Sequence, residues 1–274
     1  MDSKVGRSGT YKESAVALKA ASNQIEVYKT NEIDDVCRAW VMSLSPDIGV
    51  VVAYGVIFDA EFLELPKSGW LNLHYSLLPA LRGAAPVQNA ILRGLEETGV
   101  SVFRLDEGID TGPLVRQEAV AIGSSENAGE LLLKLTDVGA VLLSSVLMDL
   151  ESNLSGALGQ PTPAPDEKAG KPTRQSAKLS FSESCNQLSR IIRAMNPEPM
   201  AWFEFEGKAV RVLRARPTIS AGGEVGSAQL VGKELVVTCG EGGLALETVQ
   251  PAGKSAMSGS DWFRGLQTKV AFFE

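Results

Sequence analysis

The sequence predicts an α/β chain in which a parallel-sheet domain is followed by a small β-barrel domain. Residues 48–55 form a short and almost continuously apolar run, which is typical of a strand in a parallel sheet. A proline-rich stretch over 156–178 then interrupts the chain, and several short strand candidates come after it. We therefore expect a first domain over 1–155, a linker over 156–178 and a second domain over 179–274.

The elements of the first domain follow from their apolar spacing. The run at 48–55 predicts a strand that is buried on both faces. Residues 71–75 and 100–105 are expected to form further strands, with a helix over 85–93 between them. Residues 131–150 carry apolar side chains at the spacing of a helix, so we expect this helix to cover the sheet with its apolar stripe.

The linker and the second domain are predicted from composition and from short segments of alternating polarity. Prolines among small and charged residues suit an extended tether better than a core. Ser180 and Glu183 fit a capping box that opens a helix, and this helix is expected to end before Asn196 and Pro197. Strands are expected at 201–206, 208–215, 227–231, 234–239 and 243–249, and one helix with these strands predicts a small barrel.

Composition describes an ordinary soluble chain. Its 274 residues are 44% hydrophobic and 22% charged, and no apolar run is expected to span a membrane or to act as a signal peptide. Cys37, Cys185 and Cys239 are far apart and odd in number, so neither disulfides nor a cysteine zinc site is expected. With a single histidine, a histidine metal site is not expected either, and we predict a cytoplasmic protein that needs no metal.

The net charge of −7 is unevenly distributed along the chain. Between residues 168 and 216 there are ten basic and four acidic residues, so this segment is +6, while the rest, with 16 basic and 29 acidic residues, is −13. The basic residues are Lys168, Lys171, Arg174, Lys178, Arg190, Arg193, Lys208, Arg211, Arg214 and Arg216. An acidic enzyme with one phosphate-contacting surface would show this distribution, and so would a solvated charged surface.

The single histidine, His74, marks the most informative segment of the sequence. Side chains alternate along an extended strand, so Asn72 and His74 project to the same side. An amide can donate to a developing oxyanion and an imidazole can carry a proton near neutral pH, which is what acyl transfer needs. The strand candidate at 100–105 runs into a loop that contains Asp110, and the ends of strands collect the sites of open α/β sheets. We expect Asp110 to orient the imidazole and to hold it cationic.

Several motifs around these residues resemble those of methionyl-tRNA formyltransferases. They are Asn72-Leu73-His74, Ser76-Leu77-Leu78-Pro79, the Arg-Gly-Ala-Ala-Pro-Val-Gln run at 82–88, the Asp-Glu-Gly-Ile-Asp-Thr-Gly run at 106–112, and the segments 196–202 and 250–257. The wider formyltransferase superfamily shares the Asn-x-His pair and the later aspartate, but the run after Leu-Leu-Pro favours the tRNA enzymes. The resemblance implies a formyltransferase-type Rossmann-like domain followed by an OB-like domain that binds tRNA.

The resemblance also implies a reaction and its residues. The chain would transfer the formyl group of 10-formyltetrahydrofolate to the α-amino group of methionyl initiator tRNA, as a monomer and without an acyl-enzyme. Asn72 would donate to the oxyanion, and His74, held by Asp110, would move the proton. Folate contacts are expected at Tyr54, Gly55, Ile57, Ser76, Leu77, Leu78 and Pro79, and tRNA contacts at Arg7, Lys171, Arg174, Arg211 and Lys254.

The start of the chain departs from the resemblance. Members of the family normally open with a strand, a glycine-containing turn, a helix and a second strand before a basic loop, whereas this chain begins near that loop, at Gly6 and Arg7. The first domain is therefore expected to be incomplete at its N-terminus. Two other functions stay open. One is a formyltransferase for a small amine such as a nucleotide-linked amino sugar, and the other is an inactive truncated remnant that binds tRNA.

Overall fold

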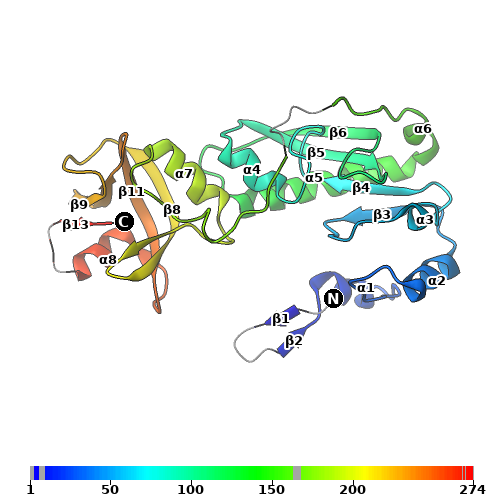
Figure 1. Cartoon of the computed structure of the whole chain (residues 1–274), viewed down its shortest axis with the longest axis horizontal. Coiled ribbons are helices and arrows are strands. Elements are labelled where there is room, and N and C mark those ends of the chain that lie inside the picture. The colour runs from blue at the N-terminus through cyan, green and yellow to red at the C-terminus, as the bar shows by residue number, and fades with distance from the viewer. Residues whose placement is uncertain (1–2, 6–9, 163–167, 267, 269, 274) are drawn as a thin grey trace. The chain divides into compact units, whose positions relative to one another are not determined.

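The computed structural model describes residues 3–5, 10–162, 168–266, 268 and 270–273, and its elements are labelled in Figure 1. The chain divides into two compact units, which are residues 1–72 with 104–108 and residues 73–103 with 109–274. The first unit contains β1 (Ser3–Val5), β2 (Thr10–Lys12), α1 (Ala15–Ser22), α2 (Asp35–Leu44), β3 (Gly49–Val52), α3 (Ala60–Leu63) and the start of β4 (Trp70–His74).

A small core holds the first unit together. Its buried members are Cys37, Val41, Val51, Phe58 and Phe62. The indole of Trp70 stacks on Phe62, with ring centroids 5.1 Å apart, and donates its Nε1–H to the carbonyl oxygen of Phe62 at 2.9 Å. Because Trp70 is the first residue of β4, this contact anchors the strand that leads to Asn72 and His74.

β3 is buried on one face only. Val51 is buried, whereas Val50 is 39% and Val52 is 44% exposed. Among the described residues β3 is the end strand of the order β3-β4-β5-β6, and the hydrophobic layer lies on the face of Val51. The prediction of a strand buried on both faces is therefore wrong, because an apolar run does not reveal how many layers cover it.

In the second unit, the sheet continues through β5 (Glu97–Arg104) and β6 (Leu114–Ala121). The chain passes from β4 to β5 through α4 (Pro86–Leu92), and Leu105, directly after β5, donates its backbone N–H to the carbonyl oxygen of Trp70, the first residue of β4. Strands β5 and β6 are antiparallel. Helix α5 (Ala128–Met148) then follows. The strands predicted at 71–75 and 100–105 and the helices predicted at 85–93 and 131–150 are thereby confirmed.

Helix α5 covers the sheet with the predicted stripe. Leu131, Leu135, Leu142 and Val146 are buried, and the Leu73 side chain of β4 lies against α5. By length and composition alone this helix of 21 residues is apolar enough to cross a membrane. The expectation that no segment reaches this level is wrong, because small and apolar residues fill both the buried and the exposed face of the helix.

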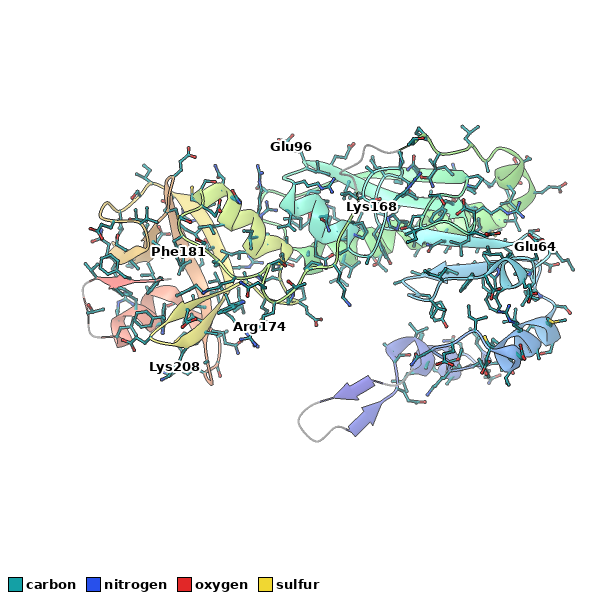
Figure 2. The ribbon with its side chains drawn as sticks, viewed as in Figure 1. Glu64, Glu96, Lys168, Arg174, Phe181 and Lys208 are labelled. Carbon is teal, nitrogen blue, oxygen red and sulfur yellow. The ribbon has the colours of Figure 1, made fainter. Side chains whose placement is uncertain are left out.

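The chain after residue 200 forms an antiparallel sheet of order β13-β9-β10-β11-β8-β7, with β12 paired to β11. Its elements are β7 (Trp202–Phe205), β8 (Lys208–Thr218), β9 (Ser227–Val231), β10 (Glu234–Thr238), β11 (Gly243–Pro251), β12 (Met257–Ser258), α8 (Gly259–Gly265) and β13 (Ala271–Phe272). The five predicted strands are confirmed, whereas β12, α8 and β13 are not among the predicted elements. The sheet curls around a core that includes Phe181 (Figure 2).

Helix α7 (Cys185–Ala194) packs on this sheet and begins later than the sequence predicts. Its N-cap is Ser184, whose Oγ accepts from the backbone N–H of Gln187 at 3.2 Å. The predicted capping box of Ser180 and Glu183 is wrong, because Glu183 instead donates its backbone N–H to the Ser180 carbonyl in a turn that precedes the helix. The predicted end before Asn196 is confirmed.

The proline-rich segment after α6 (Leu150–Ser155) is bound to the second unit at its described residues. Leu158 exchanges backbone hydrogen bonds with Leu114 at 2.8 and 2.9 Å. Ala169, which is buried, bonds through its backbone to Arg82 and Ala84. The described residues of this segment differ from a free tether, because their backbone groups find partners at the start of β6 and in the loop at 82–84.

Candidate functional site

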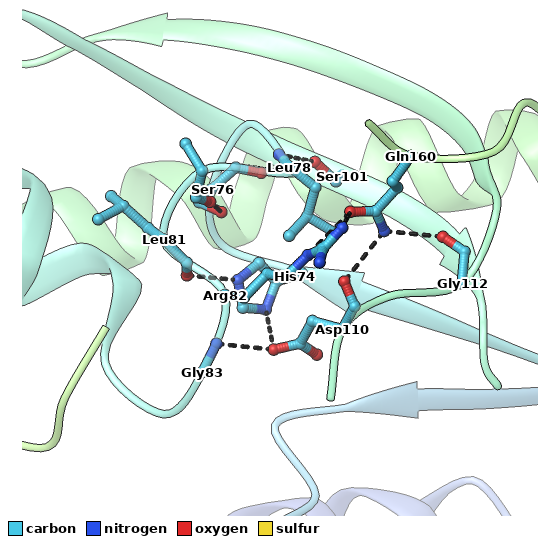
Figure 3. Close-up of polar contacts among 11 residues, drawn as sticks. His74, Ser76, Leu78, Leu81, Arg82, Gly83, Ser101, Asp110, Gly112 and Gln160 are labelled. Atoms are coloured by element: carbon cyan, nitrogen blue, oxygen red, sulfur yellow. Dashed lines mark hydrogen bonds and ion pairs between the residues drawn. The ribbon is translucent and has the colours of Figure 1, made fainter. Parts of the chain in front are cut away.

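His74 ends β4, and its imidazole is enclosed on both nitrogens (Figure 3). Nε2 lies 3.1 Å from the carbonyl oxygen of Leu81, and Nδ1 lies 3.7 Å from Oδ2 of Asp110. A carbonyl oxygen only accepts, so the Leu81 contact requires a proton on Nε2. On the other side, Nδ1 faces the Asp110 carboxylate. The ring is thus held between a carbonyl and a carboxylate.

Asp110 is positioned by its own backbone and by a second loop. Its φ of 54° is left-handed, and its side chain is 14% exposed. Oδ2 accepts the backbone N–H of Gly83 at 2.8 Å, so one carboxylate oxygen faces both this amide and His74. Gly83 has a φ of +114°, and a Cβ there would lie 3.0 Å from the Ala169 carbonyl oxygen, which explains why a glycine occupies this position.

Gln160, which lies in none of the sequence motifs, joins the two loops around His74 (Figure 3). Its Nε2 donates to the carbonyl oxygens of Asp110 at 3.0 Å and of Gly112 at 2.7 Å. Its Oε1 accepts from Nε of Arg82 at 3.1 Å and from Nη2 at 2.6 Å. No local pattern marks Gln160, because its partners lie about fifty and about eighty residues away along the chain.

The predicted folate segment 76–79 forms a tight turn above the sheet. Ser76 is fully buried, and its Oγ donates to the Ala80 carbonyl at 2.6 Å. Leu78 is also buried and donates its backbone N–H to Oγ of Ser101 at 3.1 Å. Leu77 and Pro79 are partly exposed. Of the four predicted residues, these two side chains therefore offer surface to a ligand.

The other predicted residues of the reaction site belong to the first unit. Asn72 is half-buried on β4, two residues before His74 and on the same side of the strand. Tyr54 is 43% and Ile57 is 75% exposed, and a Cβ on Gly55 would meet no atom within 4 Å. Desolvation by burial raises the pKa of the Tyr54 phenol above its usual value. These residues form an open surface after β3, and their roles stay predictions.

Three of the predicted tRNA contacts lie together. Arg174, Arg211 and Lys254 line a hollow of about 590 Å³ on the C-terminal sheet, with Trp202 in its wall. The guanidinium of Arg174 lies 5.3 Å from the Trp202 ring centroid, and Nζ of Lys178 lies 5.5 Å from it. Both cations are therefore oriented by one aromatic ring. The label of Arg174 in Figure 2 marks this part of the chain.

The remaining predicted tRNA contacts lie elsewhere. Lys171 lines a different hollow of about 640 Å³ together with Arg190. Arg7 lies outside the described residues. Two arginines of the basic segment form ion pairs with carboxylates. Arg214 pairs with Glu130 at 2.7 Å, and Arg216 pairs with Glu234 at 2.5 Å. Part of the +6 segment is thus neutralised within the protein.

Cysteine and metal chemistry find no support in the described residues. Cys37, Cys185 and Cys239 are buried and free, and burial raises the pKa of the Cys239 thiol to about 12. A thiol with this pKa stays protonated and is a poor nucleophile near neutral pH. In the part of the chain that the structure describes, no three His, Cys, Asp or Glu side chains gather as metal ligands would.

Comparison with known proteins places this geometry in a family. The family model described as formyl transferase matches residues 2–147, and the model of the formyl transferase C-terminal domain matches residues 171–267. A methionyl-tRNA formyltransferase of Paenarthrobacter aurescens (strain TC1) is 37% identical to this chain, over 97% of the chain and 87% of the relative. Other relatives, at 35% to 41% identity, have the same name.

Solved structures share the fold at low identity. HypX from Aquifex aeolicus in complex with tetrahydrofolic acid has a TM-score of 0.66 at 15% identity, and the likeness covers 93% of this chain and 47% of HypX. An N-formyltransferase from Helicobacter canadensis, in complex with folinic acid and dTDP-3-aminofucose, has a TM-score of 0.64 at 18% identity, with 88% and 85% covered. The small-amine alternative is not favoured, because the far higher identities are to the tRNA enzymes. Two family models in chain order and a relative that is 37% identical along almost the whole chain show that this protein belongs to the methionyl-tRNA formyltransferase family.

Proposed function

We propose that this chain transfers the formyl group of 10-formyltetrahydrofolate to the α-amino group of methionyl initiator tRNA. The observation that carries the proposal is the pairing of His74 with Asp110 at the end of β4, in a chain whose relatives are named for this reaction. The bound folate would supply the formyl group. The protein would contribute an oxyanion donor, a proton carrier and the surfaces that hold both substrates.

The three polar residues have separate roles in this proposal. The Asn72 amide would donate to the oxygen of the formyl group as negative charge develops, a contact whose loss costs roughly 10²- to 10³-fold in rate. His74 would stabilise this charge and carry the proton of the attacking amine to the folate nitrogen, which leaves as its bond to the formyl carbon breaks, an effect of roughly 10²- to 10⁴-fold. Since Nε2 is bound to the Leu81 carbonyl, the ring must leave this contact before Nε2 can exchange a proton with a substrate. Asp110 would keep the ring oriented while this happens.

The binding surfaces are proposed from the same family resemblance. Folate would lie against Tyr54, Gly55 and Ile57 and against the turn of Ser76, Leu77, Leu78 and Pro79. The exposed side chains among them are apolar or aromatic, which suits a flat pterin ring. The tRNA would contact Arg7, Lys171, Arg174, Arg211 and Lys254, and the hollow beside Trp202 supports this for three of the five.

The proposed organisation is a catalytic domain over 1–155, a basic linker over 156–178 and an OB-like tRNA-binding domain over 179–274. The curled antiparallel sheet after residue 200 supports the last assignment. We further propose that the protein acts as a cytoplasmic monomer and requires no metal.

A formylation assay with methionyl initiator tRNA and 10-formyltetrahydrofolate tests the function. We expect activity in the unmodified chain and losses of at least about 10²-fold in Asn72→Ala, His74→Ala and Asp110→Ala, with unchanged circular dichroism. Asp149→Ala, in an aspartate at the end of α5, is the control and should keep full activity. Normal turnover in His74→Ala would contradict the mechanism, because the chain has no second histidine. Formylation of a nucleotide-linked amino sugar in place of tRNA would contradict the substrate assignment.

A further inference from the structure

We propose that Gln160 is a positioning residue, which holds the Asp110 loop in the geometry that orients His74. This inference rests on the proposed function for its catalytic readout, but its structural readout is independent of any substrate. The Gln160 amide donates to the backbone carbonyls of Asp110 and Gly112, and it accepts from the Arg82 guanidinium. One side chain therefore ties the loop that carries Asp110 to the loop that carries Gly83.

The chemistry of these contacts requires an amide. Two backbone carbonyls need a donor, and a guanidinium needs an acceptor, and a glutamine side chain supplies both. A glutamate could still accept from Arg82, but its second oxygen would face the carbonyls of Asp110 and Gly112 without a proton. The backbone close to Gln160 is held as well, because Leu158, two residues earlier, is hydrogen-bonded to Leu114 through the backbone.

The Asp110 loop has a conformation that depends on such support. Asp110 has a positive φ, which non-glycine residues adopt at some cost in free energy. Its carboxylate oxygen must meet the Gly83 amide at 2.8 Å and face Nδ1 of His74 at 3.7 Å. Two hydrogen bonds from Gln160 to the carbonyls at the start and end of this turn hold it in place. A displacement of about 1 Å in a catalytic group can cost roughly 10²-fold in rate.

Kinetics of Gln160→Leu and Gln160→Glu test the proposal. We expect kcat to fall roughly 10- to 10²-fold in both variants, with KM for tRNA and for folate within about threefold of the unmodified chain. The matched control is Gln229→Leu, because Gln229 is also half-buried and donates its Nε2–H to a backbone carbonyl, that of Ala221, at 2.7 Å. It should lose a similar amount of thermal stability and no kcat. A purely structural role for Gln160 would give the two glutamine positions the same profile and would overturn the proposal.

A double variant asks whether Gln160 acts through Asp110. If it does, the double variant Gln160→Leu with Asp110→Ala has about the same kcat as Asp110→Ala alone, because the loop no longer carries the carboxylate that Gln160 would position. Losses in kcat that multiply would show that Gln160 acts by another route and would overturn the positioning role.

The single histidine provides a readout without substrate. In protein labelled with 15N-histidine, the two ring resonances belong to His74. At a fixed pH we expect them to move in Gln160→Leu in the same direction as in Asp110→Asn, and to stay in place in Gln229→Leu. Resonances that move in Asp110→Asn but not in Gln160→Leu would overturn the proposal. If the unmodified chain does not formylate tRNA, the proposed function fails, and these resonances still decide whether Gln160 positions Asp110.

Discussion

The hydroxyl group of Ser101, fully buried on β5, connects three segments of the chain. Oγ donates to the Ser76 carbonyl at 2.6 Å, and it accepts from the Leu78 backbone N–H at 3.1 Å and from Nε2 of Gln117 at 2.8 Å. Both ends of the turn that would contact folate therefore depend on one side chain.

We expect Ser101→Ala to lower the free energy of unfolding by about 1 to 3 kcal/mol, because it removes the partner of the Leu78 N–H and of the Ser76 carbonyl, both in buried residues. It should also weaken the binding of a folate analogue, since the turn at 76–79 loses its support. Urea unfolding and calorimetric titration measure the two effects. Ser144→Ala, at an exposed serine that bonds only within α5, is the control and should change stability by less than about 0.5 kcal/mol. Equal effects at both serines would contradict the argument.

At this scale the sequence identified residues whose local pattern is informative and missed those whose partners are distant. The Asn-x-His pair and the Asp-Thr-Gly loop sit in short motifs, and the structure brings His74 and Asp110 within 3.7 Å. Gln160 and Ser101 have no such motif. Their partners are set by how loops meet after folding, which no spacing along the chain records.

Among the elements, α8 lies very close to the C-terminal sheet at its first residue, Gly259. Gly259 is buried, and a Cβ there would lie 2.1 Å from the carbonyl oxygen of Leu246. The register of β11 against β8 shifts between Leu246 and Thr248, so the helix starts where the strand bulges. This contact sets the position of α8 on β11.

We expect Gly259→Ala to destabilise the protein by about 1 to 3 kcal/mol, because the methyl group would overlap a backbone atom that cannot move alone. Gly265→Ala, in the last turn of the same helix, is the matched control. A Cβ at Gly265 meets nothing within 4 Å, so this change should be neutral or stabilising by up to about 1 kcal/mol. Thermal melts compare the two variants. A melting temperature that is the same in both would show that the close approach does not matter.

The elements that the sequence predicted well are those with one clear period. The strands of the C-terminal sheet and helix α5 were placed within a few residues, since burial on one face leaves a regular pattern. Helix α7 starts four residues after the predicted position, because Ser180, Ser182 and Ser184 all precede the helix and only Ser184 caps it. β12 and β13 have two residues each and leave no periodicity to read.

For the whole molecule, the charge distribution matters most for binding. The net charge of +6 overestimates the positive charge that the basic segment presents to a nucleic acid. Arg216 forms ion pairs with Glu234 at 2.5 Å and with Glu247 at 3.4 Å. Arg211 lies on the same strand but faces the hollow beside Trp202, where its recorded partner is the neutral amide of Gln250. Arg211 and Arg216, both on β8, therefore have different electrostatic surroundings.

We expect the affinity for tRNA to fall steeply with salt, with a slope that decreases by about 0.7 to 0.9 for each phosphate contact removed. Arg211→Gln and Lys254→Gln should each flatten the dependence of log K on log salt by about this amount. Arg216→Gln, on the same strand, should leave it unchanged. Filter binding at several salt concentrations measures the slopes. Parallel lines for all three variants would show that the hollow does not contact phosphate.

The hydrogen bonds of Gln160 bear on how such a chain can be recombined. The two family matches end at residue 147 and resume at residue 171, so Gln160 and Ala169 lie between the regions that homology defines. Yet both are bonded to loops of the first region, Gln160 to Arg82 and Ala169 to Ala84. A chimera cut at the homology boundary would exchange these contacts together with the foreign half. A chimera that keeps the contacts around the His74 site must therefore include the segment through Ala169 together with the first region of homology.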